Sequence, residues 1–166
     1  NFKVKGVKLK NGDIIESKIV LNAAGAHSNI ITEMAFKGIE NDMKLTTKPL
    51  RHEVCVVPSP PGIDFFNQGK FIVDLDTGVH FRPETGNKIL IGSNDPTCDE
   101  QKIIKKIDDY QVELSDQWDT QVYRAALRIP NLPIAQGKNK QGVVSFYDIT
   151  EDWTPIYDKS NVEGYY

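Results

Sequence analysis

The sequence predicts an α+β fold, with a mostly antiparallel, curved sheet and helices on one face of that sheet. Two observations support this prediction. Between residues 44 and 93, and again over residues 142–149, short apolar stretches with the periodicity of strands are separated by turn residues. Between residues 99 and 129 the apolar spacing changes to that of helices. A hairpin and a strand-to-helix turn come first, so we expect residues 1–41 and 42–166 to belong to different domains.

The N-terminal part of the chain predicts a hairpin followed by a helix. Residues 2–9 alternate between apolar side chains and lysines, which is typical of a half-buried strand. Asn11-Gly12 favours a tight hairpin turn, and residues 13–21 supply the return strand. Ser28 is placed to cap a helix over residues 29–37.

The main sheet is expected to contain strands near residues 44–57, 71–74, 78–83, 88–93 and 142–149. Pro49 cannot donate a backbone hydrogen bond, so the first half of the first strand should be an edge or a bend. Two helices are expected between residues 99 and 129, with Ser115 or Asp116 capping the second. Their apolar stripe should cover one face of the sheet.

Composition excludes several classes of protein. The 166 residues carry a net charge of -3, which argues against a nucleic-acid binder. Cys55 and Cys98 stand in no metal-ligand spacing, so we expect no metal site and free thiols in a reducing cytoplasm. No apolar run is long enough to span a membrane, and no signal peptide is visible. The chain begins and ends in strand-like segments, so we expect a fragment of a longer protein; its oligomeric state is unknown.

Four segments follow one another along the chain: GVKLKNGDIIESKIVLNAAGAHSNIITEMA, PLRHEVCVV, DLDTGVHFRPETGNKILIGSNDP and YDITEDWTPI. In this order they resemble the FAD-dependent oxidoreductases of the D-amino acid oxidase superfamily, which includes glycine oxidase, sarcosine oxidases and dimethylglycine dehydrogenase. The resemblance implies that residues 1–41 are part of an FAD-binding domain and that residues 42–166 form a substrate-binding domain. The chain lacks the Gly-x-Gly-x-x-Gly sequence that seats the flavin pyrophosphate, so FAD binding by this fragment alone should be weak or absent.

The end of the return strand is a stretch with almost no side chains: Ala23, Ala24, Gly25 and Ala26. Small residues there let a backbone approach a cofactor, and the resemblance implies contact with FAD. A tight strand-to-helix crossing without a ligand is the alternative.

Four other residues are candidates for catalysis. His52 lies in an extended segment where some amine-oxidising relatives carry a histidine; a half-exposed strand residue is the alternative. Strand alternation places His80 and Arg82 on one face and Val79 and Phe81 on the other. Arg82 can bind the carboxylate of a substrate through two parallel hydrogen bonds. The alternative is an ion pair with Glu84 or another acidic residue.

Tyr147 matches a tyrosine-aspartate pair of the family and borders a substrate pocket or, alternatively, is buried in the sheet. Asp152 is expected in a turn, and Trp118 and Trp153 in packing.

Together these features predict an enzyme that oxidises a small amine or amino acid, of the sarcosine, dimethylglycine or glycine type, by hydride transfer to FAD. The alternative from another class is an assembly or scaffold protein that keeps a flavoenzyme fold without turnover. A third interpretation is an independent α+β binding module with no link to flavin.

Overall fold

The computed structural model describes residues 2–43, 46–94 and 96–166. The chain divides into two compact units. Unit 1 contains the chain up to Leu50 together with Ile103–Asp109 and Phe146–Tyr166, and unit 2 contains Arg51–Lys102 and Tyr110–Ser145. The expected domain boundary at residues 41 and 42 concerns the whole protein and stays a prediction.

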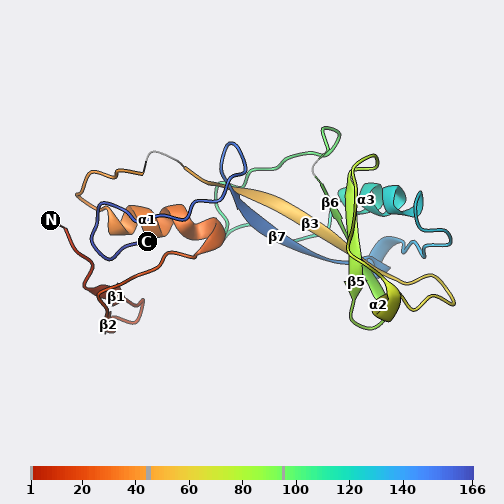
Figure 1. Cartoon of the computed structure of the whole chain (residues 1–166), viewed down its shortest axis with the longest axis horizontal. Coiled ribbons are helices and arrows are strands. Elements are labelled where there is room, and N and C mark those ends of the chain that lie inside the picture. The colour runs from red at the N-terminus through yellow and green to blue at the C-terminus, as the bar shows by residue number, and fades with distance from the viewer. Residues whose placement is uncertain (1, 44–45, 95) are drawn as a thin grey trace. The chain divides into compact units, whose positions relative to one another are not determined.

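Unit 1 begins with the predicted hairpin. Strands β1 (Gly6–Lys8) and β2 (Ile14–Glu16) pair in antiparallel fashion (Figure 1). The turn is closed by a hydrogen bond from the Leu9 amide to the Asp13 carbonyl, 2.8 Å, and Gly12 has a φ of 96° that favours glycine. The hairpin is thus confirmed, although its strands are shorter than the sequence pattern indicates.

The predicted helix follows a short 3₁₀ turn, η1 (Gly25–His27), and is α1 (Ser28–Ala35). Ser28 is the first helical residue, so the prediction that it caps the helix is wrong by one position. The cap residue is His27, whose side chain makes no capping hydrogen bond. The core of unit 1 is small: Phe36, Val162 and Tyr165 are buried together.

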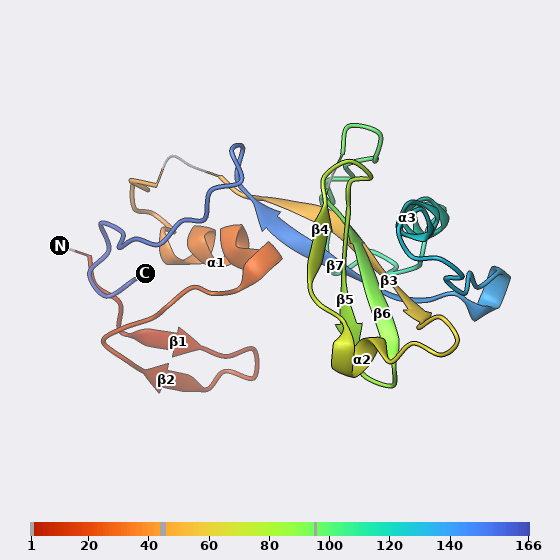
Figure 2. The same ribbon diagram turned by 45° about the vertical axis from the view of Figure 1, so that its right-hand side comes forward.

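The main sheet has five strands in the order β4-β5-β6-β3-β7 (Figures 1 and 2). Their bounds are β3 Lys48–Pro58, β4 Ile72–Asp74, β5 Val79–Glu84, β6 Lys88–Ser93 and β7 Gln141–Ile149. The pairs β4–β5, β5–β6 and β3–β6 are antiparallel, which confirms the predicted sheet type. Residues 44 and 45 of the first predicted strand lie outside the described residues.

Helix α3 (Gln117–Ala126) covers one face of this sheet, against β5 and β6 (Figure 2). Trp118, Val122 and Ala125 of α3 are fully buried against alternate residues of the strands: Cys55, Val57, Val79, Phe81, Ile89 and Ile91. Trp118 therefore has the packing role that the sequence predicts. Shorter helical turns are α2 (Phe65–Gln68) and η2 (Gly137–Asn139).

The first of the two helices expected between residues 99 and 129 is not formed. Ile103 instead bridges to Leu50 in antiparallel fashion, and the Ile104 amide donates to the Pro49 carbonyl, 2.8 Å. Ile104 is buried while Ile103 is exposed, which is strand-like alternation. The start of β3 has backbone groups to satisfy, and this tertiary pairing overrides the helical spacing.

The second expected helix is confirmed as α3. Ser115 supports its start, because the Ser115 hydroxyl accepts a hydrogen bond from the Gln117 amide, 3.3 Å.

Candidate functional site

The face of the sheet opposite α3 carries the polar candidates of unit 2. On β5, Val79 and Phe81 are buried toward α3, whereas His80 is half-buried and Arg82 is exposed on the other face. The predicted alternation along this strand is therefore confirmed. We call this second surface the His80 face; it is made by His80 and Arg82 of β5, His52 and Val54 of β3, and Gly92 of β6.

The His80 ring lies across the neighbouring strand. His80 and Gly92 are register partners. A Cβ built on Gly92 would lie 2.5 Å from Cε1 and 2.6 Å from Nε2 of His80, and 3.3 Å from Cγ1 of Val54. Nδ1 of His80 is 2.9 Å from Oδ1 of Asn94, and the Phe71 ring stands 5.7 Å away between centroids. The imidazole is thus held in one place by Asn94 and Phe71 and lies against the bare backbone of Gly92.

Arg82 makes the ion pair with Glu84 that the sequence offered as the alternative to a carboxylate site. Its Nη1 lies 3.1 Å from Oε2 of Glu84 and donates to the Pro83 carbonyl at 2.9 Å. Hydrogen bonds from Thr85, and then the charge of Arg82, lower the pKa of Glu84 below its usual range. The pair is partly exposed to solvent, where water and salt screen ion pairs and leave them a small contribution to stability.

His52 is buried rather than half-exposed, at 7% exposure. It precedes Val54 by two residues on β3, so it belongs to the His80 face. Arg51 points the opposite way and is committed to an internal network. Its guanidinium pairs with the buried carboxylate of Glu53 and donates to the Glu113 carbonyl, 2.8 Å. Arg51 is therefore a structural residue and not a free cation for a substrate.

Tyr147 lies on β7 in unit 1 and is 45% exposed, so burial in the sheet does not describe it. Its convergence with the residues of unit 2 stays a prediction. Asp152 occupies a turn, as expected: Oδ1 accepts from the Thr154 amide and the Thr150 hydroxyl, both at 3.0 Å. These hydrogen bonds lower the pKa of Asp152. Trp153 is 46% exposed, so its predicted packing role is only partial.

In unit 1 the small residues after the return strand form an accessible turn. Ala23, Ala24 and Gly25 are exposed, Gly25 has a φ of 55°, and no heavy atom lies within 4 Å of the position of a Cβ on Gly25. The Asn22 side chain holds the turn, accepting from the Ala24 amide and donating to the Ser28 carbonyl. A ligand can reach this backbone directly, so Ala23–Ala26 fit a cofactor that contacts main chain.

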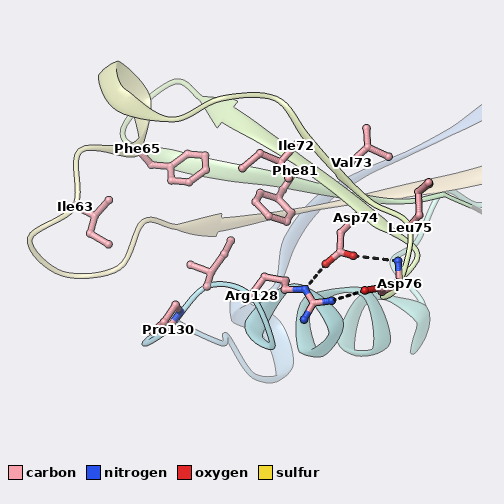
Figure 3. A pocket seen from close by; sticks show the side chains of 11 residues that line it. Ile63, Phe65, Ile72, Val73, Asp74, Leu75, Asp76, Phe81, Arg128 and Pro130 are labelled. Atoms are coloured by element: carbon pink, nitrogen blue, oxygen red, sulfur yellow. Dashed lines mark hydrogen bonds and ion pairs between the residues drawn. The ribbon is translucent and has the colours of Figure 1, made fainter.

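A separate cleft of about 610 Å³ lies near strand β4, also within unit 2 (Figure 3). Its polar groups are paired with one another: Arg128 bonds to Asp74 and, at 3.3 Å, to Asp76. Hydrogen bonding to Arg128 lowers the pKa of Asp74 to about 2. Phe81 also lines the cleft, from the side of β5 opposite His80, and none of the predicted site residues does so.

Two residues of the site were missed at the level of sequence. Gly92 and Asn94 both lie in the family-like segment that ends in GSNDP, where neither was predicted as a site residue. One signal could have found them: a glycine, Gly92, inside a predicted strand and directly before Ser93-Asn94. A glycine weakens a strand, so its presence there often marks the close approach of another group. In the described residues, no cluster of three or more metal-ligating side chains is found, and no helix is long and apolar enough to cross a membrane.

Comparisons with known proteins agree with this architecture. The chain is similar in fold to the solved structure of L-proline dehydrogenase from P. horikoshii, with a TM-score of 0.71 and 23% sequence identity. The match covers 99% of this chain and 40% of that chain, so the chain spans less than half the length of that relative. No curated protein matches the chain. A family model described as FAD dependent oxidoreductase, DAO, matches residues 1–166, and the chain therefore belongs to this family of FAD-dependent oxidoreductases.

Proposed function

We propose that the whole protein oxidises a small amine or amino acid, and that the His80 face borders its substrate. The observation that carries the proposal is the pairing of a held imidazole and a surface guanidinium, His80 and Arg82, on one side of β5 beside the bare backbone of Gly92. Bound FAD would supply a hydride acceptor for the carbon next to the amine nitrogen. The side chains then have to orient the substrate and remove a proton from its ammonium group.

His80 suits the removal of that proton. A neutral imidazole has one nitrogen with a free lone pair, and an amine must lose its ammonium proton before it can give up a hydride. Across residues 2–43, 46–94 and 96–166, Nδ1 of His80 is hydrogen-bonded to Asn94 and no hydrogen bond reaches Nε2. The substrate ammonium would donate its proton to Nε2.

Arg82 suits the substrate carboxylate. Arginine can donate two parallel hydrogen bonds to a carboxylate, and the bond to Glu84 is a partly exposed one that costs little to exchange. His52, which shares the His80 face, would lie near the substrate, and a contact between Tyr147 and the substrate stays a prediction. Ala23, Ala24, Gly25 and Ala26 would contact FAD through their backbone, in line with the exposure of the first three. The fold relative is named for L-proline, so L-proline joins sarcosine, dimethylglycine and glycine among the amines to assay.

A cytoplasmic location is part of the proposal. Both cysteines are free thiols, and Cys55 is buried. Burial, and then the charge of Glu53, raise the pKa of the Cys55 thiol, which makes it unreactive. Such thiols suit a reducing compartment.

The second candidate function is a scaffold without turnover. One observation favours it: Arg82 already has a carboxylate partner, Glu84, of its own chain. Reduction of the flavin by an amine separates the two functions, because a scaffold would leave the flavin oxidised. A module unrelated to flavin is not retained, since the family match covers the chain.

The test of the enzyme proposal is Arg82→Ala in the FAD-loaded protein. We expect KM for a carboxylate-bearing amine to rise by about 10- to 200-fold, and KM for the decarboxylated analogue to change little, because a charged hydrogen bond contributes about 1.5–3 kcal/mol. Glu84→Gln is the matched control: it breaks the same ion pair but keeps the guanidinium. If Arg82→Ala changes KM equally for both substrates, or if Arg82→Ala and Glu84→Gln change KM equally, the role of Arg82 is only to form a structural ion pair.

A further inference from the structure

The His80 imidazole is held from both ends of the ring. Its Nδ1 is 2.9 Å from Oδ1 of Asn94, and its Cε1–Nε2 edge lies over Gly92. Asn94 is itself anchored, because its backbone amide donates to the Gly78 carbonyl at 2.9 Å. The partner of His80 is thus fixed to the turn that starts β5, and the ring cannot turn without losing that hydrogen bond.

The direction of the hydrogen bond follows from the other end of the Asn94 amide. Nδ2 of Asn94 faces the Asp74 carbonyl at 3.5 Å, and a carbonyl oxygen can only accept. The amide nitrogen therefore belongs on that side, and Oδ1 belongs toward His80. An amide oxygen also can only accept, so Nδ1 of His80 must carry the hydrogen.

We infer that Asn94 is a positioning residue that locks neutral His80 in the Nδ1–H tautomer, so that the lone pair is presented at Nε2 over Gly92. This inference rests on the proposed function, in which Nε2 receives the ammonium proton of the substrate. Without Asn94 the ring is free to carry its hydrogen on Nε2, and an Nε2–H group can accept no proton there.

Gly92 also positions the His80 ring, because its lack of a side chain leaves room for the imidazole. Any side chain at this position would occupy the place of the ring, since a Cβ would approach Cε1 and Nε2 to 2.5 and 2.6 Å. Contacts under 3.0 Å between such atoms are not tolerated, so Gly92→Ala should push the imidazole away from the sheet and from Asn94. Gly92→Ala and Asn94→Leu should therefore have the same consequence for the tautomer.

The tautomer can be measured directly by long-range ¹H–¹⁵N spectra of the 166-residue chain labelled at its three histidines. In the neutral ring, we expect Nδ1 of His80 to give the signal of a nitrogen that carries a hydrogen and Nε2 that of a nitrogen without one. His27 is an internal control with the opposite pattern, because its Nε2 lies 2.9 Å from the Asp108 carboxylate. Asn94→Leu should shift His80 toward the Nε2–H form and leave His27 unchanged. An Nε2–H tautomer of His80 in the native chain overturns the inference, as does a tautomer that Asn94→Leu does not alter.

Kinetics of the FAD-loaded protein give the second readout. Asn94→Leu should lower kcat/KM for the amine by about 10- to 100-fold, as misplacing a supporting group does elsewhere. The same substitution in a His80→Gln background should have no further effect. If the spectra show the Nδ1–H form but His80→Gln keeps full activity, the positioning by Asn94 stands and the proton-accepting role of His80 in the proposed function fails. An undiminished effect of Asn94→Leu in the His80→Gln background overturns the inference.

Discussion

The two units of the chain differ most in how much apolar surface each buries. Unit 2 has a continuous core in which α3 covers the inner face of β3, β5 and β6. Among its described residues, unit 1 buries Phe36, Val162 and Tyr165 in one cluster and leaves several large apolar side chains of the hairpin and the segment after it exposed: Ile14, Ile15, Ile19 and Leu21. Apolar burial is the main stabilising term in folding, at about 25 cal/mol per Å². Unit 2 can therefore be stable by itself, whereas apolar burial contributes far less to the free energy of unfolding of unit 1.

The comparison also separates two kinds of site. The His80 face stands on rigid strands whose far side is packed, so its side chains are held by the core beneath them. The turn at Ala23–Ala26 depends on hydrogen bonds from Asn22 and on a small cluster. A site on well-packed strands can keep its geometry without a ligand, whereas the geometry of the turn rests on fewer packing contacts.

The largest expected effect comes from the core of unit 2. Trp118 is fully buried, and its indole donates to the Gln141 carbonyl at 2.8 Å. Trp118→Ala should destabilise unit 2 by about 3–5 kcal/mol, because it leaves a large cavity and an unsatisfied carbonyl. Hydrogen exchange followed by mass spectrometry should show lost protection across β5, β6 and α3.

Phe36→Ala is the matched substitution in unit 1, where the Phe36 ring packs edge-on against Tyr165, 6.0 Å between centroids. It should remove protection around α1 and leave β5 and β6 protected. If both substitutions unprotect both units equally, the units unfold together and the difference in stability between them is not real.

The next effect concerns the cofactor. We expect the 166-residue chain to bind FAD weakly or not at all, because it contains no Gly-x-Gly-x-x-Gly sequence and a single turn cannot offset the entropy lost on association. Titration of FAD followed by flavin fluorescence checks this. A sub-micromolar affinity would show that the turn of unit 1 is a complete site. Gly25→Val is the control for any residual binding, as it adds a side chain at the exposed turn.

The smallest effect is a pH dependence of unit 2. The Asp74 carboxylate bonds to Arg128 and has a pKa of about 2, below the value of about 3.9 in an unfolded chain. A lowered pKa stabilises the folded state above pH ~4, and this contribution is lost as the pH falls toward 2. The urea midpoint should therefore fall more steeply between pH 4 and 2 in the native chain than in Asp74→Asn. Asp76→Asn keeps the Asp74–Arg128 pair and should retain the steep fall; identical slopes for all three proteins would contradict the assignment.

The sequence by itself determined the hairpin, the strands from residue 71 to residue 93, and the helix after Ser115. Each of these is specified locally: Asn11-Gly12 selects a turn, alternation along residues 79–82 selects faces, and Ser115 satisfies free amides at a helix start. The alternation along residues 79–82 also placed His80 and Arg82 on one face, and the four quoted segments carried the family resemblance.

Only the tertiary structure decided the rest, because the deciding contacts join residues distant in the chain. Residues 102–104 have helical apolar spacing, yet they pair with the start of β3 and satisfy its backbone groups. His80 lies against Gly92 because of the register between β5 and β6, which local sequence patterns do not predict. Asn94 contacts the His80 ring because its backbone is hydrogen-bonded to Gly78, in the turn before β5. Periodicity indicates which face a side chain occupies, but the partner on that face is set by packing between strands.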